Sequence, residues 1–176
     1  STQPAYFGIQ NHDDWVGTNQ ALNLQLISLD VNKNPLNTKG AVVEVIKYEW
    51  QNMLENYYGS YRYNSKPIEK LISSKVINFE EGKSNYAYTP TTSGEYEIRV
   101  KLPNYNQGYS YSKFYAYSYG TTSSSSFQVN QDGEVLIETD KTEYQEKDEV
   151  KVLCKTPFNG RLLLTVERNQ VFEYHQ

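Results

Sequence analysis

Sulfur-containing residues are rare in this chain of 176 residues, which has one cysteine and one methionine. A single cysteine excludes an internal disulfide framework, and Cys154 matches none of the paired-cysteine spacings of zinc or redox sites. Cys154 alternates with Val150 and Val152 in a β-rich segment. We therefore expect it to be a small buried residue on the apolar face of a strand.

Basic clusters and long apolar runs are also missing. Lys and Arg number 17 against 21 Asp and Glu, the net charge is -4, and no block of basic residues occurs. Nucleic acid and anionic membranes are therefore disfavoured as partners. The longest apolar run, Leu162 to Leu164, is far shorter than the roughly 20 residues of a membrane-spanning helix, so we expect no direct insertion into a membrane.

Motifs for catalysis and metal binding are absent as well. No Ser, Cys or His stands in a nucleophile motif, and the adjacent acids Asp13–Asp14 and Glu80–Glu81 lie in predicted turns. The histidines, His12 and His175, are far apart in the sequence, whereas a metal site needs several convergent ligands. We expect no enzymatic activity, no metal and no cofactor.

One segment has the spacing with which calcium-binding loops begin, because Asp30, Asn32 and Asn34 follow the pattern Asp-x-Asn-x-Asn. Such a loop also needs glycine at its sixth position and a carboxylate at its twelfth, where this chain has Pro35 and Ala41. Asn and Pro are common turn formers. A simple turn is therefore the favoured interpretation.

Apolar residues alternate with a period of two wherever they cluster, which predicts an all-β chain. Leu22, Leu24 and Leu26, for example, alternate with Asn23, Gln25 and Ile27, as expected of a half-buried strand. Strands are expected at residues 6–9, 21–29, 42–50, 71–79, 86–88, 95–102 and 109–119. Seven strands are enough for a two-sheet antiparallel sandwich.

Two further expectations concern the connections between these strands. Residues 21–50 are expected to form a pair of adjacent strands whose connection contains Asn37 to Gly40. Residues 51–66 carry several tyrosines around Gly59 but no helical period, so they are expected to form an insertion or a hairpin loop.

Tyrosine is abundant, with 17 copies. Between residues 105 and 119, tyrosines and small residues alternate, which predicts a strand with aromatic rings on one face. The rings form either a ladder that completes the domain or a platform for a sugar or a protein, and the ladder is favoured because so many tyrosines cannot all be functional. The candidate binding surface is Tyr109, Tyr111, Tyr115 and Tyr117.

The turn at Asn130–Gly133 is the expected boundary of the first domain. Beyond it, strands are expected at residues 135–138, 149–155, 161–167 and 171–174, and Asn159–Gly160 is a strong hairpin signal, so these strands should form a meander. Four strands make one sheet but not two packed layers. We therefore expect part of a second sandwich, with incomplete cover and weak self-association through its free edge.

This region also contains a distinctive sequence pattern. Its residues are Asp140, Lys141, Tyr144, Asp148–Val150, Thr156–Leu162, Thr165–Arg168 and Val171. These residues resemble a segment of bacterial alpha-2-macroglobulin-like proteins, which are extracytoplasmic protease traps built from macroglobulin-type β-sandwich domains. The family usually has Pro-Gly where this chain has Glu146–Lys147. The turn before Asp148 must therefore form without a glycine.

The resemblance implies a macroglobulin or Ig-like antiparallel sandwich over residues 1–130, followed by the N-terminal part of the next, bait-bearing domain over residues 131–176. The implied function is that of a non-catalytic scaffold in an extracytoplasmic endopeptidase inhibitor, which meets target proteases through the full-length parent protein. The thioester of many macroglobulins needs a Cys-x-x-Gln pairing that Cys154 does not supply. Two alternatives stay open: a carbohydrate-binding or adhesive sandwich, and a simple stalk domain.

Overall fold

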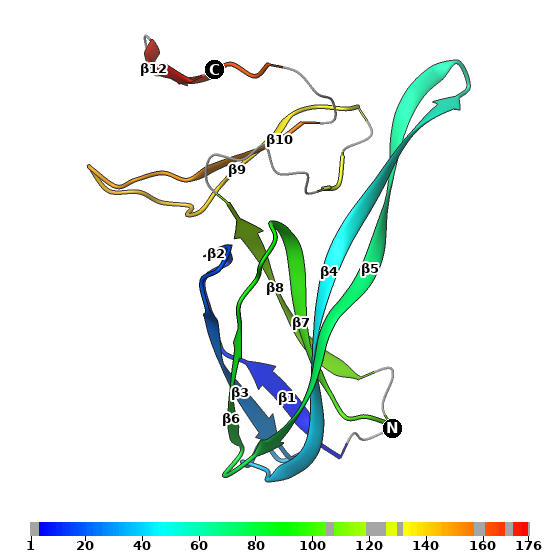
Figure 1. Cartoon of the computed structure of the whole chain (residues 1–176), viewed down its shortest axis with the longest axis vertical. Coiled ribbons are helices and arrows are strands. Elements are labelled where there is room, and N and C mark those ends of the chain that lie inside the picture. Colours follow the sequence, from blue (N-terminus) through cyan, green and yellow to red (C-terminus); the bar gives the residue numbers. More distant parts are fainter. Residues whose placement is uncertain are drawn as a thin grey trace. The chain divides into compact units, whose positions relative to one another are not determined.

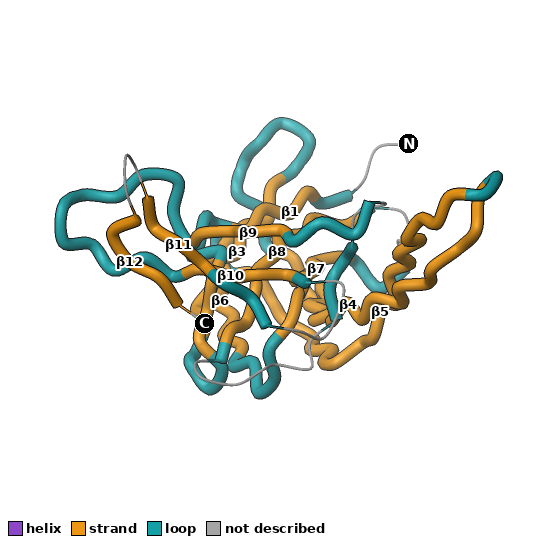
Figure 2. The backbone as a smooth tube through the Cα atoms, turned by 90° about the horizontal axis from the view of Figure 1, so that it is seen from above, coloured by secondary structure: helices purple, strands orange, loops and turns teal. Residues whose placement is uncertain are grey.

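The structure of the chain is a computed structural model that describes residues 4–104, 108–118, 126–129, 132–156, 161–167 and 171–175 (Figure 1). Every element of regular structure in these residues is a β-strand, and no helix occurs among them (Figure 2). This confirms the all-β class that the period-two alternation predicts.

Contacts divide the chain into two compact units. The first unit is Ser1–Met53 with Asn64–Gln128, and the second is Leu54–Tyr63 with Val129–Gln176. Each unit is described by itself.

The first unit contains two sheets. A three-stranded antiparallel sheet has the order β1-β3-β6, and a five-stranded sheet has the order β2-β8-β7-β4-β5, in which the pairing of β2 with β8 is parallel. The strands of the first sheet are β1 (Tyr6–Ile9), β3 (Leu22–Leu29) and β6 (Lys83–Tyr88). The strands of the second are β2 (Trp15–Gly17), β4 (Thr38–Tyr57), β5 (Ser60–Phe79), β7 (Gly94–Lys101) and β8 (Tyr109–Tyr117).

Apolar side chains from both sheets form one core between them. On β3, Leu22, Leu24 and Leu26 are buried while their neighbours along the strand are exposed, as the alternation predicts. The opposite sheet contributes alternate residues of β4 and β7 in the same way. Those with no exposed surface are Ala41, Val43, Val45, Ile98 and Val100.

The expected pairing of residues 21–29 with 42–50 is wrong, because β3 and β4 belong to different sheets. β3 pairs with β1 and β6 instead, and its register with β6 runs from Leu22 opposite Tyr88 to Ile27 opposite Lys83. Both β3 and β4 carry a buried apolar face. They cover the core from its two sides, which two neighbouring strands of one sheet cannot do.

The chain crosses between the sheets twice at the same end of the sandwich, from β3 to β4 and from β5 to β6. At this end Ser28 donates its backbone N–H to the carbonyl of Gly82 at 2.8 Å, and its buried hydroxyl lies 2.7 Å from that of Thr38. Gly82 has a φ of 72°, and a Cβ there would lie 2.7 Å from Pro35. Only glycine fits this close approach.

Residues 51–66 form regular strand rather than the expected loop. β4 and β5 have 20 residues each, and they run side by side to a turn at Tyr58–Gly59 (Figure 1). Tyr58 and Gly59 have φ values of 50° and 87°, which suits a tight turn between antiparallel strands. The expectation of a hairpin was therefore right and that of a loop was wrong. Residues 51–66 lack a helical period because they are strand, and most of them are exposed.

Besides the end of the β4–β5 hairpin, the second unit contains two separate two-stranded antiparallel sheets in its described residues. β9 (Leu136–Thr139) pairs with β10 (Val152–Lys155), and β11 (Leu164–Glu167) pairs with β12 (Val171–His175). The expected single meander is therefore wrong, and the hairpin signal at residues 159–160 lies outside the described residues.

Burial in the second unit also differs from expectation. Cys154 is only half-buried, and Val150 and Val152 are 46% and 40% exposed. Lys155 is buried instead, with its ammonium 2.8 Å from a carboxylate oxygen of Glu138. A two-stranded sheet has no second layer of its own, so the apolar face predicted by alternation is not covered.

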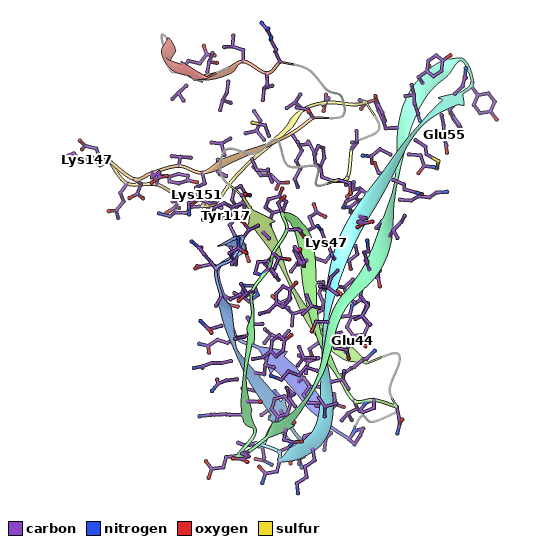
Figure 3. The ribbon with its side chains drawn as sticks, viewed as in Figure 1. Glu44, Lys47, Glu55, Tyr117, Lys147 and Lys151 are labelled. Carbon is purple, nitrogen blue, oxygen red and sulfur yellow. The ribbon has the colours of Figure 1, made fainter. Side chains whose placement is uncertain are left out.

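The loop between β9 and β10 is held together by residues of the segment that resembles bacterial alpha-2-macroglobulin-like proteins. Asp140 accepts hydrogen bonds from the Tyr144 hydroxyl at 2.8 Å and from the Lys151 backbone N–H at 3.0 Å. These bonds hold the pKa of the Asp140 carboxyl below its usual value, the Tyr144 bond contributing most. At the tip of the loop, Lys147 takes up a φ of 75°, so the turn does form without glycine (Figure 3).

We expect Leu26→Ala to lower the free energy of unfolding by about 3 kcal/mol, because it leaves a cavity where a side chain has no exposed surface. Chemical denaturation measures the change. The matched control is Gln25→Ala on the exposed face of the same strand, with a change within about 0.5 kcal/mol. Equal effects of the two substitutions would contradict the buried face of β3.

Lys147→Gly should stabilise the loop between β9 and β10 by about 1 kcal/mol, because glycine adopts a positive φ without the steric cost paid by other residues. Slower amide hydrogen exchange over residues 140–151 would report the gain. Glu146→Gly is the control, since Glu146 has no positive φ and glycine there only adds unfolded-state entropy. Faster exchange in Lys147→Gly would refute the predicted strain.

Candidate interaction surface

The four candidate tyrosines lie on one strand, β8, on the face that points away from the core. Phe114 and Ala116, on the other face of β8, are buried in the core. The structure therefore brings Tyr109, Tyr111, Tyr115 and Tyr117 onto the outer face of the five-stranded sheet, as the alternation predicts. They fall into two groups with different surroundings.

Tyr115 and Tyr117 are packed against Trp15 of β2. The Trp15 ring centre lies 5.9 Å from that of Tyr115 and 6.4 Å from that of Tyr117. β2 runs parallel to β8 and places Trp15 directly opposite Tyr115. These two tyrosines are half-buried in an aromatic cluster, which occupies much of their surface.

Tyr109 and Tyr111 are more open, with 42% and 59% of their surface exposed. Their rings meet edge to face at 6.2 Å. The Arg99 guanidinium lies 4.9 Å from the ring centre of Tyr109, a distance suited to a cation–π contact. The residues opposite them on β7 are Lys101 and Arg99 rather than other tyrosines, so the ladder on this face alternates aromatic rings with charges.

A network of charged side chains lies beside these rings and links several strands of the sheet. Its centre is Glu97 of β7, which is only 3% exposed and accepts hydrogen bonds from Arg99 Nε and from the Tyr48 hydroxyl, the latter at 2.8 Å. Arg99 reaches beyond β4 to β5, where Nη1 and Nη2 donate to the two carboxylate oxygens of Glu69 at 2.8 and 2.7 Å. Lys113 of β8 lies 3.8 Å from Glu97.

The pKa values of three members of the network, Glu69, Arg99 and Tyr48, are shifted by their contacts. Hydrogen bonds from Arg99 hold the pKa of the Glu69 carboxyl below its usual value. The hydrogen bonds that Arg99 donates, first to Glu69 and then to Glu97, raise the pKa of the Arg99 guanidinium. Burial, followed by the hydrogen bond to Glu97, raises the pKa of Tyr48 to about 12. The Tyr48 hydroxyl therefore remains a neutral donor to a carboxylate at neutral pH.

Sequence reasoning missed this network. The strand expected at residues 95–102 puts Glu97 and Arg99 on the face opposite its apolar residues, where charged side chains are ordinarily exposed. The available signal was the row of four charges, Glu95, Glu97, Arg99 and Lys101, on alternate positions of one strand. Only Glu97 of the four is buried, and its partners Tyr48 and Lys113 come from β4 and β8, which a single-strand pattern does not reveal.

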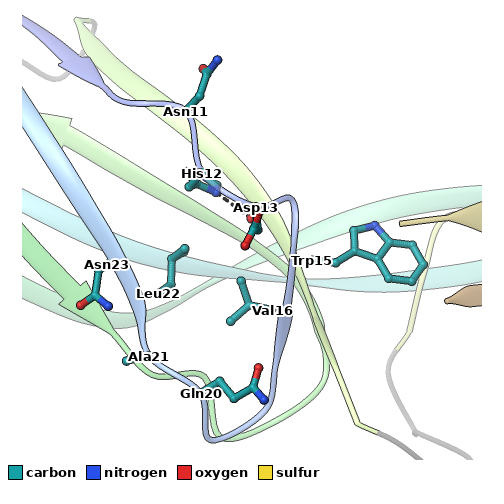
Figure 4. Close-up of a pocket in the computed structure, with 9 residues that line it drawn as sticks. All are labelled: Asn11, His12, Asp13, Trp15, Val16, Gln20, Ala21, Leu22 and Asn23. Carbon is teal, nitrogen blue, oxygen red and sulfur yellow. Dashed lines mark hydrogen bonds between the residues drawn. The ribbon is translucent and has the colours of Figure 1, made fainter. Parts of the chain in front are cut away.

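A pocket of about 590 Å³ lies near the segment that joins β1 to β2 (Figure 4). His12 is one of its lining residues, with Nδ1 2.8 Å from the Asp13 carbonyl oxygen and Nε2 2.8 Å from the Ser112 hydroxyl. The carbonyl can only accept, so Nδ1 carries the proton and Ser112 donates to Nε2. Ser112 does not line the pocket, and the hydrogen bonds of His12 fasten this segment to β8.

The Asp30 segment forms a turn in which the side chain acts as an acceptor for backbone groups. Asp30 Oδ1 receives hydrogen bonds from the N–H groups of Asn32 and Asn34, both at 2.8 Å. Within the described ranges, no group of three or more His, Cys, Asp or Glu side chains is arranged to hold a metal ion. The same part of the chain contains no helix with the length and apolarity needed to span a membrane.

The two mainly antiparallel sheets of the first unit pack face to face around one core and so define a β-sandwich. Residues 8–117 match the family "Bacterial macroglobulin domain 6". The chain belongs to this family of bacterial macroglobulin domains.

Relatives and solved structures agree with this assignment. The chain is 18% identical over 161 residues to an alpha-2-macroglobulin homolog of Yersinia pestis, covering 91% of this chain and 8% of that protein. It is 22% identical over 178 residues to alpha-2-macroglobulin of Rickettsia conorii, covering 99% of this chain and 9% of that protein. The chain therefore spans less than a tenth of the length of these relatives.

The fold matches parts of larger structures. The native conformation of E. coli alpha-2-macroglobulin superimposes with a TM-score of 0.56 at 14% identity, over 98% of this chain and 12% of that chain. Salmonella alpha-2-macroglobulin reacted with methylamine gives a TM-score of 0.55 at the same identity and the same coverage. These matches confirm the expected resemblance and the macroglobulin fold.

Replacing Arg99 by Met should lower the free energy of unfolding by about 3 kcal/mol, because it leaves the buried Glu97 carboxylate without its main partner. Lys70→Met is the control, since Lys70 and Glu49 form an exposed ion pair worth about 0.5 kcal/mol. Both values come from chemical denaturation at neutral pH. A similar small loss in the two variants would show that the network around Arg99 contributes little.

Proposed function

We propose that this chain is a non-catalytic scaffold segment of a bacterial alpha-2-macroglobulin-like endopeptidase inhibitor. The match of residues 8–117 to bacterial macroglobulin domain 6 is the observation that supports this most strongly. The chain spans only 8% and 9% of the curated relatives. Trapping of a target protease is accordingly proposed as an activity of the larger protein, to which this segment contributes mechanically.

The proposed contribution is stiffness. In a protease trap, cleavage of a bait segment releases a rearrangement, so the neighbouring domains have to transmit movement rather than absorb it. Arg99 and Glu97 tie β7 to β5 and β4 on the outer face, while the core holds the two sheets together on the inner face. A sandwich braced on both faces of one sheet is suited to this task.

The same proposal assigns residues 1–130 to the macroglobulin domain and residues 131–176 to the start of the next, bait-bearing domain. The family match ends at residue 117, and the loop held by Asp140 consists of residues that resemble the family segment. Extracytoplasmic location and protease partners belong to this proposal too. The unfolding of residues 1–130 on their own tests this division. We expect their unfolding midpoint to equal that of the same residues in the whole chain.

The tyrosines of β8 favour a second, weaker candidate, which is binding of sugars or adhesion to a protein. Tyr109 and Tyr111 are its open part, with 42% and 59% of their surface exposed. Trp15 occupies one side of Tyr115 and Tyr117, which leaves a platform of two rings rather than four. A glycan that binds tightly and is lost in Tyr111→Ala, with unchanged unfolding, would favour this candidate over the trap.

A chimera tests the trap directly. This chain would replace the matched segment of E. coli alpha-2-macroglobulin, and a protease would be assayed on a large protein and on a small peptide. We expect the folded chimera to suppress cleavage of the large substrate only, and the isolated chain to suppress neither. Hydrolysis of a substrate by the isolated chain, or one-to-one inhibition by it, would overturn the non-catalytic scaffold.

A further inference from the structure

The free edge of the five-stranded sheet is a surface that the scaffold role does not explain. The order β2-β8-β7-β4-β5 gives β5 a described neighbour on one side only, and that neighbour is β4. An edge strand presents backbone N–H and C=O groups to which a further extended segment can pair. At 20 residues, β5 is much longer than most strands, which typically have about 5 to 6 residues.

The part of this edge within the first unit carries large aliphatic side chains in solvent. Ile68, Leu71, Ile72 and Val76 are 42%, 57%, 44% and 65% exposed. Isolated exposed apolar residues are ordinary on protein surfaces, but four within nine residues of an edge strand are a local concentration of exposed aliphatic side chains. We call residues 66–76 of β5 the docking edge.

Positively charged residues lie among these aliphatic residues in the sequence of β5. Lys66, Lys70 and Lys75 lie on the docking edge, and its one acid, Glu69, has both carboxylate oxygens engaged by Arg99. Lys70 forms an ion pair of 3.0 Å with Glu49 of the neighbouring strand β4, and both side chains are exposed. The docking edge is thus basic and aliphatic, although the whole chain has a net charge of -4.

We infer that the docking edge binds an extended acidic, aliphatic peptide segment of a partner protein, which adds to the sheet as a strand beside β5. Backbone pairing would supply the affinity in such a complex. The exposed side chains of Ile68, Leu71, Ile72 and Val76 would contact the aliphatic side chains of the partner. Lys66 and Lys75 would select acidic residues and reject basic ones. This inference does not depend on protease trapping.

The lysines and Pro67 also have a simpler explanation, because proteins use lysine and proline to protect exposed edges from aggregation. The two explanations differ in outcome. Protective lysines predict that no peptide pairs with β5 and that their removal promotes self-association. A docking edge predicts a saturable complex whose affinity depends on the sign of the peptide's charge.

The probe is a capped peptide of about eight residues, an ordinary strand length, in which Glu alternates with Val and Ile. Its binding to the whole chain would be followed by calorimetry and by amide hydrogen exchange. We expect saturable binding with new protection confined to residues 66–76. The same peptide with Lys in place of Glu, or with alternate backbone amides methylated, should bind at least about tenfold more weakly.

Matched protein variants locate the site. Lys66→Glu combined with Lys75→Glu should weaken binding of the acidic peptide about tenfold or more. The control combines Lys39→Glu with Lys83→Glu, which makes the same change in net charge at exposed lysines outside the docking edge, and it should leave binding within about twofold.

Three results would overturn the inference. One is absence of binding by the acidic peptide to a folded wild-type chain. Another is equal weakening by the two pairs of substitutions, which would indicate non-specific attraction. The third is concentration-dependent dimerisation that protects residues 66–76 without any peptide, since the occupant of the edge would then be a second copy of this chain.

Discussion

The first unit depends on strand β7, which is buried on both of its faces. Its inner face places Tyr96, Ile98 and Val100 in the core, where hydrophobic burial is the main driving force for folding. Its outer face carries Glu97, which is almost as buried as those residues. A carboxylate without partners would be costly there, so the hydrogen bonds from Arg99 and Tyr48 are a condition for the sheet to exist in this form.

This constraint explains how the outer face is arranged. Arg99 has to reach Glu97, and its guanidinium then spans from the ring of Tyr109 to the carboxylate of Glu69 on β5. The charges of the outer face are therefore organised by their pairing with one another. Lys66 and Lys75 of β5 lie outside this pairing, and Lys70 pairs with Glu49 instead, which is why the edge of the sheet differs in character from its centre.

The candidate site was only partly predictable. The alternation of tyrosines with small residues correctly placed four rings on one face of β8. It did not reveal that Trp15 covers two of them, because β2 reaches β8 from about a hundred residues away in a parallel pairing, a distance over which a local pattern carries no information. The buried ion network was missed for the same reason, since its members come from β4, β5, β7 and β8.

In the first unit, outside residues 51–66, the sequence by itself determined most of the strands and the apolar face of each, because side chains alternate with a period of two whatever lies beside the strand. It also determined the turns, through residues such as Asp30 and Gly82. Only the tertiary structure decided which strands are neighbours. Alternation is satisfied equally by any pairing that buries the apolar face, so β3 pairs with β6 rather than β4 according to how the two layers close over the core.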